Sequence, residues 1–151
     1  MSNENRKCQN HVMRLRNLVP EDESLLKDLE QRQETAIGSL RTLQNKQHVK
    51  VIETNGRLCA GVVAVVKSAA MDGEDHELLC VLLADHERKG LATRACREML
   101  NEVLDDPSVH RVIGCVDREN KSSRALIERL DGTFLQQREV IDRGQDIYVF
   151  K

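Results

Sequence analysis

Apolar and polar residues alternate along several short stretches of the chain, which is the pattern of β-strands that bury one face. Residues 11–17 alternate in this way, while residues 77–83 carry an unbroken apolar run, as expected for a central strand buried on both faces. The dipeptide Asn55-Gly56 favours a hairpin because both residues tolerate a positive φ. The remaining strands are predicted at residues 48–53, 57–67, 109–116, 133–140 and 146–150.

Apolar residues three or four positions apart predict helices between these strands. Pro20 opens the first helix, and the acidic residues at 21–23 complement its positive start. Further helices are predicted at residues 34–44, 89–104 and 121–130, the last one capped by Gly132. The resulting order, β-α-α-β-β-β-α-β-α-β-β, predicts an α/β fold with one mixed sheet and helices on both faces. We expect a flexible tail at residues 1–11 and a single domain at residues 12–151.

The composition agrees with a globular domain and excludes several function classes. The 151 residues are 40% hydrophobic and 32% charged, which argues against disorder. Aromatic residues make up only 2% and the formal net charge is −2, so we expect no nucleic-acid partner. The longest apolar run, residues 60–66, is too short to span a bilayer, so we expect no membrane partner.

The cysteines and histidines bear on compartment and metal binding. Five cysteines are an odd number without a C-x-x-C spacing, which indicates reduced thiols in a cytoplasmic protein. The first residues are polar and do not resemble a signal peptide. The five histidines do not cluster with the cysteines, so no metal site is predicted.

One segment carries recognisable chemistry, because it leads from the apolar strand through a polar turn into a long helix. The first N–H groups of a helix have no partner within it and suit an anion such as a pyrophosphate. Gly90 and Ala92 have no or small side chains, so an anion can approach the backbone closely, and Lys89 adds a positive charge. The segment is neither a Walker loop nor a G-x-G-x-x-G fingerprint. The residues alone therefore predict a phosphate-binding turn.

Two motifs resemble those of one family. The pattern Glu87-x-x-Gly90-x-Ala92 at a strand–turn–helix corner is similar to the coenzyme A motif of the GNAT superfamily of N-acetyltransferases, usually Gln/Arg-x-x-Gly-x-Gly/Ala. A second block, which begins Asn120-x-x-Ser123 and continues to residue 134, resembles that family's next motif. The resemblance spans residues 13–150. Within the family, the motif residues resemble the branch that acetylates ribosomal-protein N-termini and its small-molecule relatives.

The resemblance implies a GNAT fold and transfer of an acetyl group from acetyl-CoA to an amine. Backbone N–H groups near Val81 and Leu82 would bind the thioester carbonyl, and one such donor can be worth roughly 3 kcal/mol. Asn120 and Ser123 would meet the pantetheine amides and the pyrophosphate. The implied cofactor-binding residues are Val81, Leu82, Leu83, Ala84, Glu87, Arg88, Lys89, Gly90, Leu91, Ala92, Thr93, Asn120 and Ser123.

Three positions depart from the family's pattern. Glu87 stands where a glutamine or arginine is usual, and Ala84 replaces the usual proline of the turn. Ile127 falls where the second motif often has a tyrosine that protonates the leaving thiolate. A free thiol has a pKa near 8.5, so coenzyme A can leave with little help.

The general base and the general acid of the implied reaction have several candidates. Loss of the attacking amine's proton at pH 7 costs about 1.4 kcal/mol for an α-amine and about 4.6 kcal/mol for a lysine. The position at which several family members carry a carboxylate base falls at His76, beside Glu77, and either is a candidate base or else a solvated side chain. Tyr148 is a candidate acid or else a half-buried residue of the sheet. Cys115 could face the pantetheine channel, or could pack as a small apolar side chain.

Two other function classes stay open. A non-catalytic coenzyme A-binding or interaction module would explain Ile127 in place of tyrosine. A phosphate-binding protein without a link to coenzyme A would explain the turn alone. The amine cannot be read from the sequence, because family members differ in the first two helices, here residues 20–44. A homodimer through the last hairpin is a further hypothesis.

Overall fold

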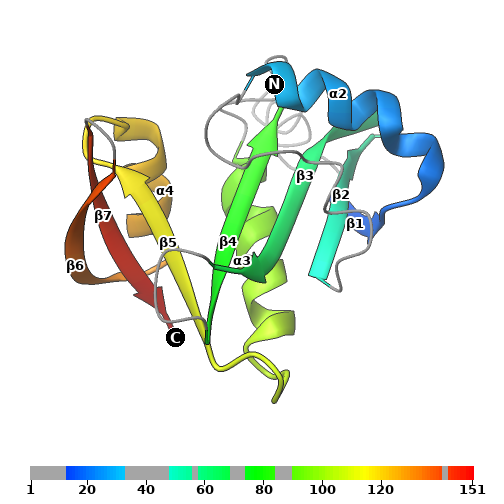
Figure 1. Cartoon of the computed structure of the whole chain (residues 1–151). Helices are drawn as coiled ribbons and strands as arrows, with labels where there is room; N and C mark the ends of the chain where they lie inside the picture. The colour runs from blue at the N-terminus through cyan, green and yellow to red at the C-terminus, as the bar shows by residue number, and fades with distance from the viewer. Residues whose placement is uncertain (1–12, 33–47, 56–57, 69–73, 84–89, 141–142) are drawn as a thin grey trace, which may run out of the picture.

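The computed structural model describes residues 13–32, 48–55, 58–68, 74–83, 90–140 and 143–151. They form a seven-stranded sheet in the order β1-β2-β3-β4-β5-β7-β6, in which β4 and β5 are parallel and all other neighbours antiparallel (Figure 1). The strands are β1 (Met13–Asn17), β2 (His48–Thr54), β3 (Leu58–Lys67), β4 (Asp75–Leu82), β5 (Arg111–Asp117), β6 (Thr133–Val140) and β7 (Arg143–Phe150). A 3-10 turn, η1 (Pro20–Asp22), precedes α2 (Glu23–Arg32), and the other helices are α3 (Leu91–Val103) and α4 (Lys121–Arg129).

The helices cover both faces of the sheet, which confirms the predicted mixed sheet with helices on both faces. On one face, Leu25, Leu26 and Leu29 of α2 pack against buried residues of β2, β3 and β4. On the other face, the apolar stripe of α3 and Ile127 of α4 join a larger core with Phe150 of β7. The α2 cluster contains no residue of β5, β6 or β7, so α2 covers only half of its face (Figure 1).

Most element boundaries lie within a few residues of those predicted. The long helix begins at Leu91, not at residue 89, because Gly90 takes a φ of 75° at its N-cap. β7 begins at Arg143, three residues earlier than predicted, because its ladder with β6 extends to the pair Val140–Arg143. The predicted helix at residues 34–44 and the tail at residues 1–11 lie outside the described residues.

One acidic residue at the start of the first helix has a role beyond the one predicted. Asp22 is buried, and its two carboxylate oxygens accept hydrogen bonds from Arg16 at 2.8 and 2.9 Å. Arg16 also donates to Glu53, at 2.6 Å. These bonds tie η1 to β1 and β2, so Asp22 is mainly a tertiary contact and not only a complement to the helix dipole.

The prediction that the apolar strand is buried on both faces is wrong. Within β4 only Asp75 and Val81 are buried, and the residues between His76 and Cys80 are half-buried. The reason is that β5 pairs with the first three residues of β4 alone. The apolar residues of β4 therefore lie on a strand that pairs with β3 along its length but with β5 over only three residues.

Candidate active site

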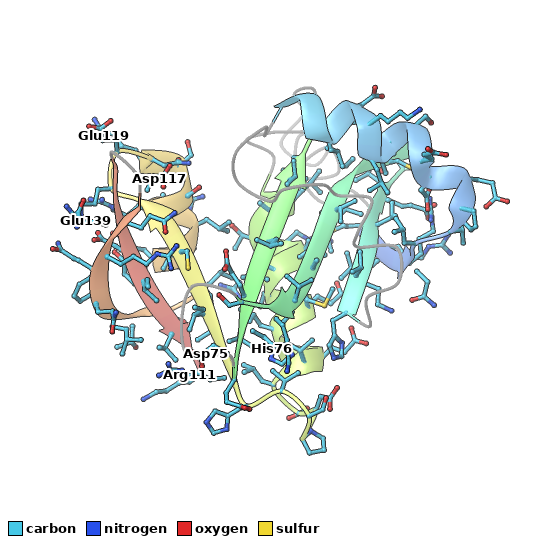
Figure 2. All side chains as sticks on the ribbon, in the orientation of Figure 1. Asp75, His76, Arg111, Asp117, Glu119 and Glu139 are labelled. Atoms are coloured by element: carbon cyan, nitrogen blue, oxygen red, sulfur yellow. The ribbon has the colours of Figure 1, made fainter. Side chains whose placement is uncertain are left out.

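The point where β4 and β5 separate is the organising feature of the site. The two strands pair only over Asp75–Glu77 and Arg111–Ile113, and then diverge (Figure 1). Where the two strands begin to pair, Arg111 donates from Nε and Nη2 to the two carboxylate oxygens of Asp75, each at 2.8 Å (Figure 2). The guanidinium lowers the pKa of the buried Asp75 carboxyl. This bidentate pair links the two strands at the first residue pair of their short ladder.

The register of β4 determines which of its backbone groups face the divergence. Leu83 N–H donates to Ala60 O, so the odd-numbered residues of β4 direct their N–H and C=O groups toward β3. The Val81 N–H is therefore used within the sheet. The even-numbered residues Cys80 and Leu82 point their backbone groups the other way, beyond the part of β4 that pairs with β5. Of the two predicted donors, the register favours Leu82 and adds Cys80.

The start of α3 presents a second set of backbone donors. The first hydrogen bond of this helix runs from Arg94 N–H to Gly90 O at 3.2 Å, so the N–H groups of Leu91, Ala92 and Thr93 have no partner within the helix. No atom lies within 4 Å of the position that a Cβ on Gly90 would occupy. An anion can thus approach this backbone closely. The rest of the predicted turn, Ala84, Glu87, Arg88 and Lys89, lies outside the described residues.

Glu77 sits at the last residue pair before β4 and β5 separate, opposite Ile113. Its side chain is partly buried, and its Oε1 accepts a hydrogen bond from Ser68 Oγ at 3.0 Å. The Cys115 thiol lies close enough to affect the pKa of this carboxyl. Burial raises the pKa of Glu77 above its ordinary value, although Ser68, Cys115 and Arg138 act in the opposite direction. A carboxylate with a raised pKa is a better proton acceptor than an ordinary one.

His76 lies next to Glu77 in the sequence but faces the opposite side of the sheet, because side chains alternate along a strand. It shares its face with Leu78 and Cys80, which pack against the α3 core. Its Nδ1 is buried and makes no hydrogen bond in the described part of the chain. Burial lowers the pKa of His76, and the neighbouring His48 acts in the same direction. The structure therefore separates the two candidate bases.

The other two catalytic candidates are also on opposite faces. Cys115 lies on the Glu77 face, where burial and the neighbouring Glu77 carboxylate raise its pKa to about 12. A thiol with this pKa is neutral at pH 7, which fits a packing role or that of a weak donor to Glu77. Tyr148 lies on the α4 face, with its ring against that of Phe134 in an edge-to-face contact, the centroids 5.7 Å apart. It occupies the position of a half-buried sheet residue.

The residue in place of the family's tyrosine is part of the core. Ile127 is 6% exposed, and it fills the space above two glycines, Gly114 and Gly132. A Cβ on Gly114 would come within 2.7 Å of Ile127 Cδ1. Close packing of this kind leaves no room for a phenol at this position.

Asn120 and Ser123 have a structural role, and the cofactor-binding role expected of them stays a prediction. Asn120 is the N-cap of α4, and its Oδ1 accepts a hydrogen bond from Ser123 N–H at 3.0 Å. This bond satisfies one of the helix's unpaired amides. Both residues lie just beyond β5, at the end where it has diverged from β4.

Ser68 and Arg138 are residues of this site that the sequence reasoning missed. Ser68 directly follows β3 and Arg138 lies in β6, and both lower the pKa of Glu77. Their distance from Glu77 along the chain gives no local signal. Only a known register between β3, β4, β5, β7 and β6 would have placed them on one face.

The described residues show neither a cluster of metal ligands nor a membrane-spanning helix. No group of three or more His, Cys, Asp or Glu side chains in this part of the chain is arranged to hold a metal ion. Likewise, none of its helices is long and apolar enough to cross a membrane.

Comparison with known proteins gives a family and a fold. The family model described as acetyltransferase (GNAT) domain matches residues 6–133. A GNAT-family acetyltransferase from Bacillus anthracis has a similar structure, with a TM-score of 0.73, 16% identity, and coverage of 91% of this chain and 93% of that one. The microcin C7 self-immunity acetyltransferase MccE, in complex with acetyl-CoA and AMP, gives a TM-score of 0.68 at 21% identity, with 93% of each chain covered. A spermidine N-acetyltransferase chimera from Vibrio cholerae and hSSAT gives 0.71 at 15% identity, over 91% of this chain and 94% of that one. A search of curated proteins finds no match.

Proposed function

The chain belongs to the GNAT acetyltransferase family of acetyl-CoA-dependent acyltransferases, and from this premise we propose that it acetylates the nitrogen of a primary amine. The amine would be carried by a small molecule or by a peptide N-terminus. The observation that carries the proposal is Glu77, a partly buried carboxylate with a raised pKa at the point where β4 and β5 separate.

The residues present fit acetyl-CoA. The amides of Leu91, Ala92 and Thr93 are unpaired within α3 and lie beside a bare Gly90, which suits a pyrophosphate. Along β4, the backbone groups of Cys80 and Leu82 face the divergence, and amide groups of this kind suit the pantetheine arm. Acetyl-CoA would supply an acetyl group activated as a thioester. The related MccE, whose structure contains acetyl-CoA, supports the same assignment.

Glu77 would remove the proton from the attacking amine. Its raised pKa narrows the difference from the pKa of an amine, and each unit so gained lowers the cost of proton transfer by about 1.4 kcal/mol. Ser68 holds Oε1, which orients the carboxylate. The Leu82 and Cys80 N–H groups would orient the acetyl carbonyl. Helix α4 carries no tyrosine, and Ile127 is packed into the core. Coenzyme A would therefore leave without a general acid from this helix.

A non-catalytic coenzyme A-binding module is the second candidate, and Ile127 in place of tyrosine is the observation that favours it. The two candidates differ in turnover. We would incubate the protein with acetyl-CoA and a panel of α-amines, diamines and peptides, and follow both thiol release and the mass of the acetylated product. Turnover supports the enzyme. Coenzyme A binding by calorimetry without turnover on any amine would support the module, and stabilisation by free phosphate equal to that by coenzyme A would indicate a phosphate-binding protein.

A further inference from the structure

Several polar side chains gather on one face of the sheet at the start of β4. Asp75 pairs with Arg111, and paired residues project to the same face; Glu77 lies on this face too, two residues further along β4. Val66 of β3 pairs with Glu77, so Ser68, two residues after Val66, also projects to this face. The fold therefore brings Asp75, Arg111 and Ser68 to the side of the sheet that carries the proposed base.

A continuous series of hydrogen bonds connects these residues. Arg111 donates from Nε and Nη2 to the carboxylate of Asp75, each at 2.8 Å, and Figure 2 shows the two residues together where β4 and β5 begin. The backbone oxygen of Asp75 accepts from Ser68 N–H at 2.9 Å. Ser68 Oγ in turn donates to Glu77 Oε1 at 3.0 Å. Asp75 is 5% and Ser68 7% exposed, so water competes little for these groups.

The bond between Ser68 and Asp75 lies at the end of a ladder. It comes directly after Lys67–His76, the last residue pair of β3 and β4. Hydrogen bonds at the end of an element open more readily than those in its middle. The ion pair opposes this opening, because two charge-assisted bonds tie the first residue of β4 to β5. An anchored Asp75 therefore keeps its backbone oxygen in place for Ser68.

We propose that Asp75 and Arg111 are positioning residues for Glu77, and that they act through Ser68 to hold the carboxylate in the orientation in which it meets the amine. The inference rests on the proposed role of Glu77 as the base, and it extends that role to an ion pair that does not touch the substrate. The geometry of a reacting group matters, because a misplacement of about 1 Å can lower the rate by about 10²-fold.

The groups around Glu77 give this role a signature. Burial raises the pKa of Glu77, whereas Ser68, which follows β3, Cys115 of β5 and Arg138 of β6 lower it. A disturbance that weakens the Ser68 bond therefore raises this pKa. An effect of Arg111 that passes through Ser68 disappears once the serine hydroxyl is removed, whereas a direct electrostatic effect persists.

The test is a double-mutant cycle of Ser68→Ala and Arg111→Gln on the full-length protein. The readout is an NMR titration of the Glu77 carboxyl carbon, whose signal is assigned with Glu77→Gln. Ser68→Ala should raise the pKa of Glu77, and Ser68→Thr, which keeps the hydroxyl, should return it toward that of the wild type. Arg111→Gln should also raise this pKa, and should add nothing in the Ser68→Ala background. Where Arg111→Gln does not fold, Arg111→Lys takes its place, because it keeps the charge and loses the bidentate geometry.

Arg14→Gln is the matched control. Arg14 donates to Glu53 Oε1 at 2.7 and 3.2 Å and so links β1 to β2, away from Glu77. Whatever its effect on thermal stability, this substitution should leave the pKa of Glu77 as in the wild type. On an amine that the wild type acetylates, Ser68→Ala and Arg111→Gln should each lower kcat by about 10-fold or more and leave KM for acetyl-CoA unchanged.

An unchanged pKa of Glu77 in Arg111→Gln would overturn the proposal, as would a shift of equal size with and without the Ser68 hydroxyl. The ion pair would then stabilise the ladder only. If no amine is acetylated and the cycle still gives the expected coupling, the proposed function fails, while the connection from Arg111 to Glu77 stands. Turnover without coupling would keep the proposed function and exclude the positioning role.

Discussion

Replacing Glu77 by glutamine tests the proposed base with the least disturbance of the fold. Glutamine has nearly the same size, and its side-chain oxygen can still accept the hydrogen bond that Ser68 Oγ gives to Oε1 at 3.0 Å. Because burial already disfavours the charged form of Glu77, loss of that charge should cost little stability at neutral pH. We expect the free energy of unfolding to stay within about 1 kcal/mol of that of the wild type.

The effect on turnover should be much larger. Proton transfer from an α-ammonium of pKa about 8 to an ordinary carboxylate of pKa about 4.3 is uphill by roughly 5 kcal/mol, and each unit by which burial raises the pKa of Glu77 removes about 1.4 kcal/mol of this. A positioned general base typically contributes about 10²- to 10⁴-fold. Glu77→Gln should therefore lower kcat by this factor while leaving the affinity for coenzyme A unchanged.

The pH profile identifies the group. In the wild type, kcat/KM should fall as pH drops through the raised pKa of Glu77, because the protonated carboxyl cannot accept a proton. Glu77→Gln should lose this acid limb and keep only the limb of the amine itself. Glu102→Gln, at an exposed position on α3, is the matched control and should behave as wild type. A Glu77→Gln enzyme with kcat/KM within about threefold of wild type and the same acid limb would refute the assignment.

Three further substitutions test other parts of the structure. His76→Gln should flatten the pH dependence of thermal stability: burial lowers the folded-state pKa of His76 below its usual 6.5, so wild-type stability falls as pH drops from about 6.5 toward that folded pKa. Gly61→Ala should lower the free energy of unfolding by about 1–3 kcal/mol in urea titrations, because a Cβ there would overlap the Val81 carbonyl oxygen. Ile127→Tyr should destabilise by about 1–3 kcal/mol and not raise turnover, because Ile127 fills the space above Gly114.

For each of these three substitutions, one result would contradict the prediction. An unchanged pH dependence in His76→Gln would mean that the histidine is solvated in the folded state. Full stability of Gly61→Ala would mean that β4 can shift away from β3 at little cost. Faster turnover of Ile127→Tyr would restore the family's usual acid to this chain and remove the reason for considering a non-catalytic module.

The sequence by itself determined the local elements, the mixed sheet with helices on both faces, and the motif that led to the family. These follow from patterns with periods of two and about 3.6 residues and from backbone requirements at single positions, such as the bare Gly90 at the start of α3. The separation of β4 from β5 was not predictable. The same apolar sequence is compatible with a strand that is paired on both edges and with one that is paired on a single edge. In this structure β5 pairs with only three residues of β4.

The tertiary structure alone decided between the candidate bases. His76 and Glu77 are adjacent in the chain, yet alternation puts one against the α3 core and the other on the opposite face of the sheet with Ser68 and Arg138. The pKa of each depends on groups that other strands bring to it from far along the chain. Desolvation and electrostatic interactions depend on distance in space, and separation along the chain sets that distance only within a single element.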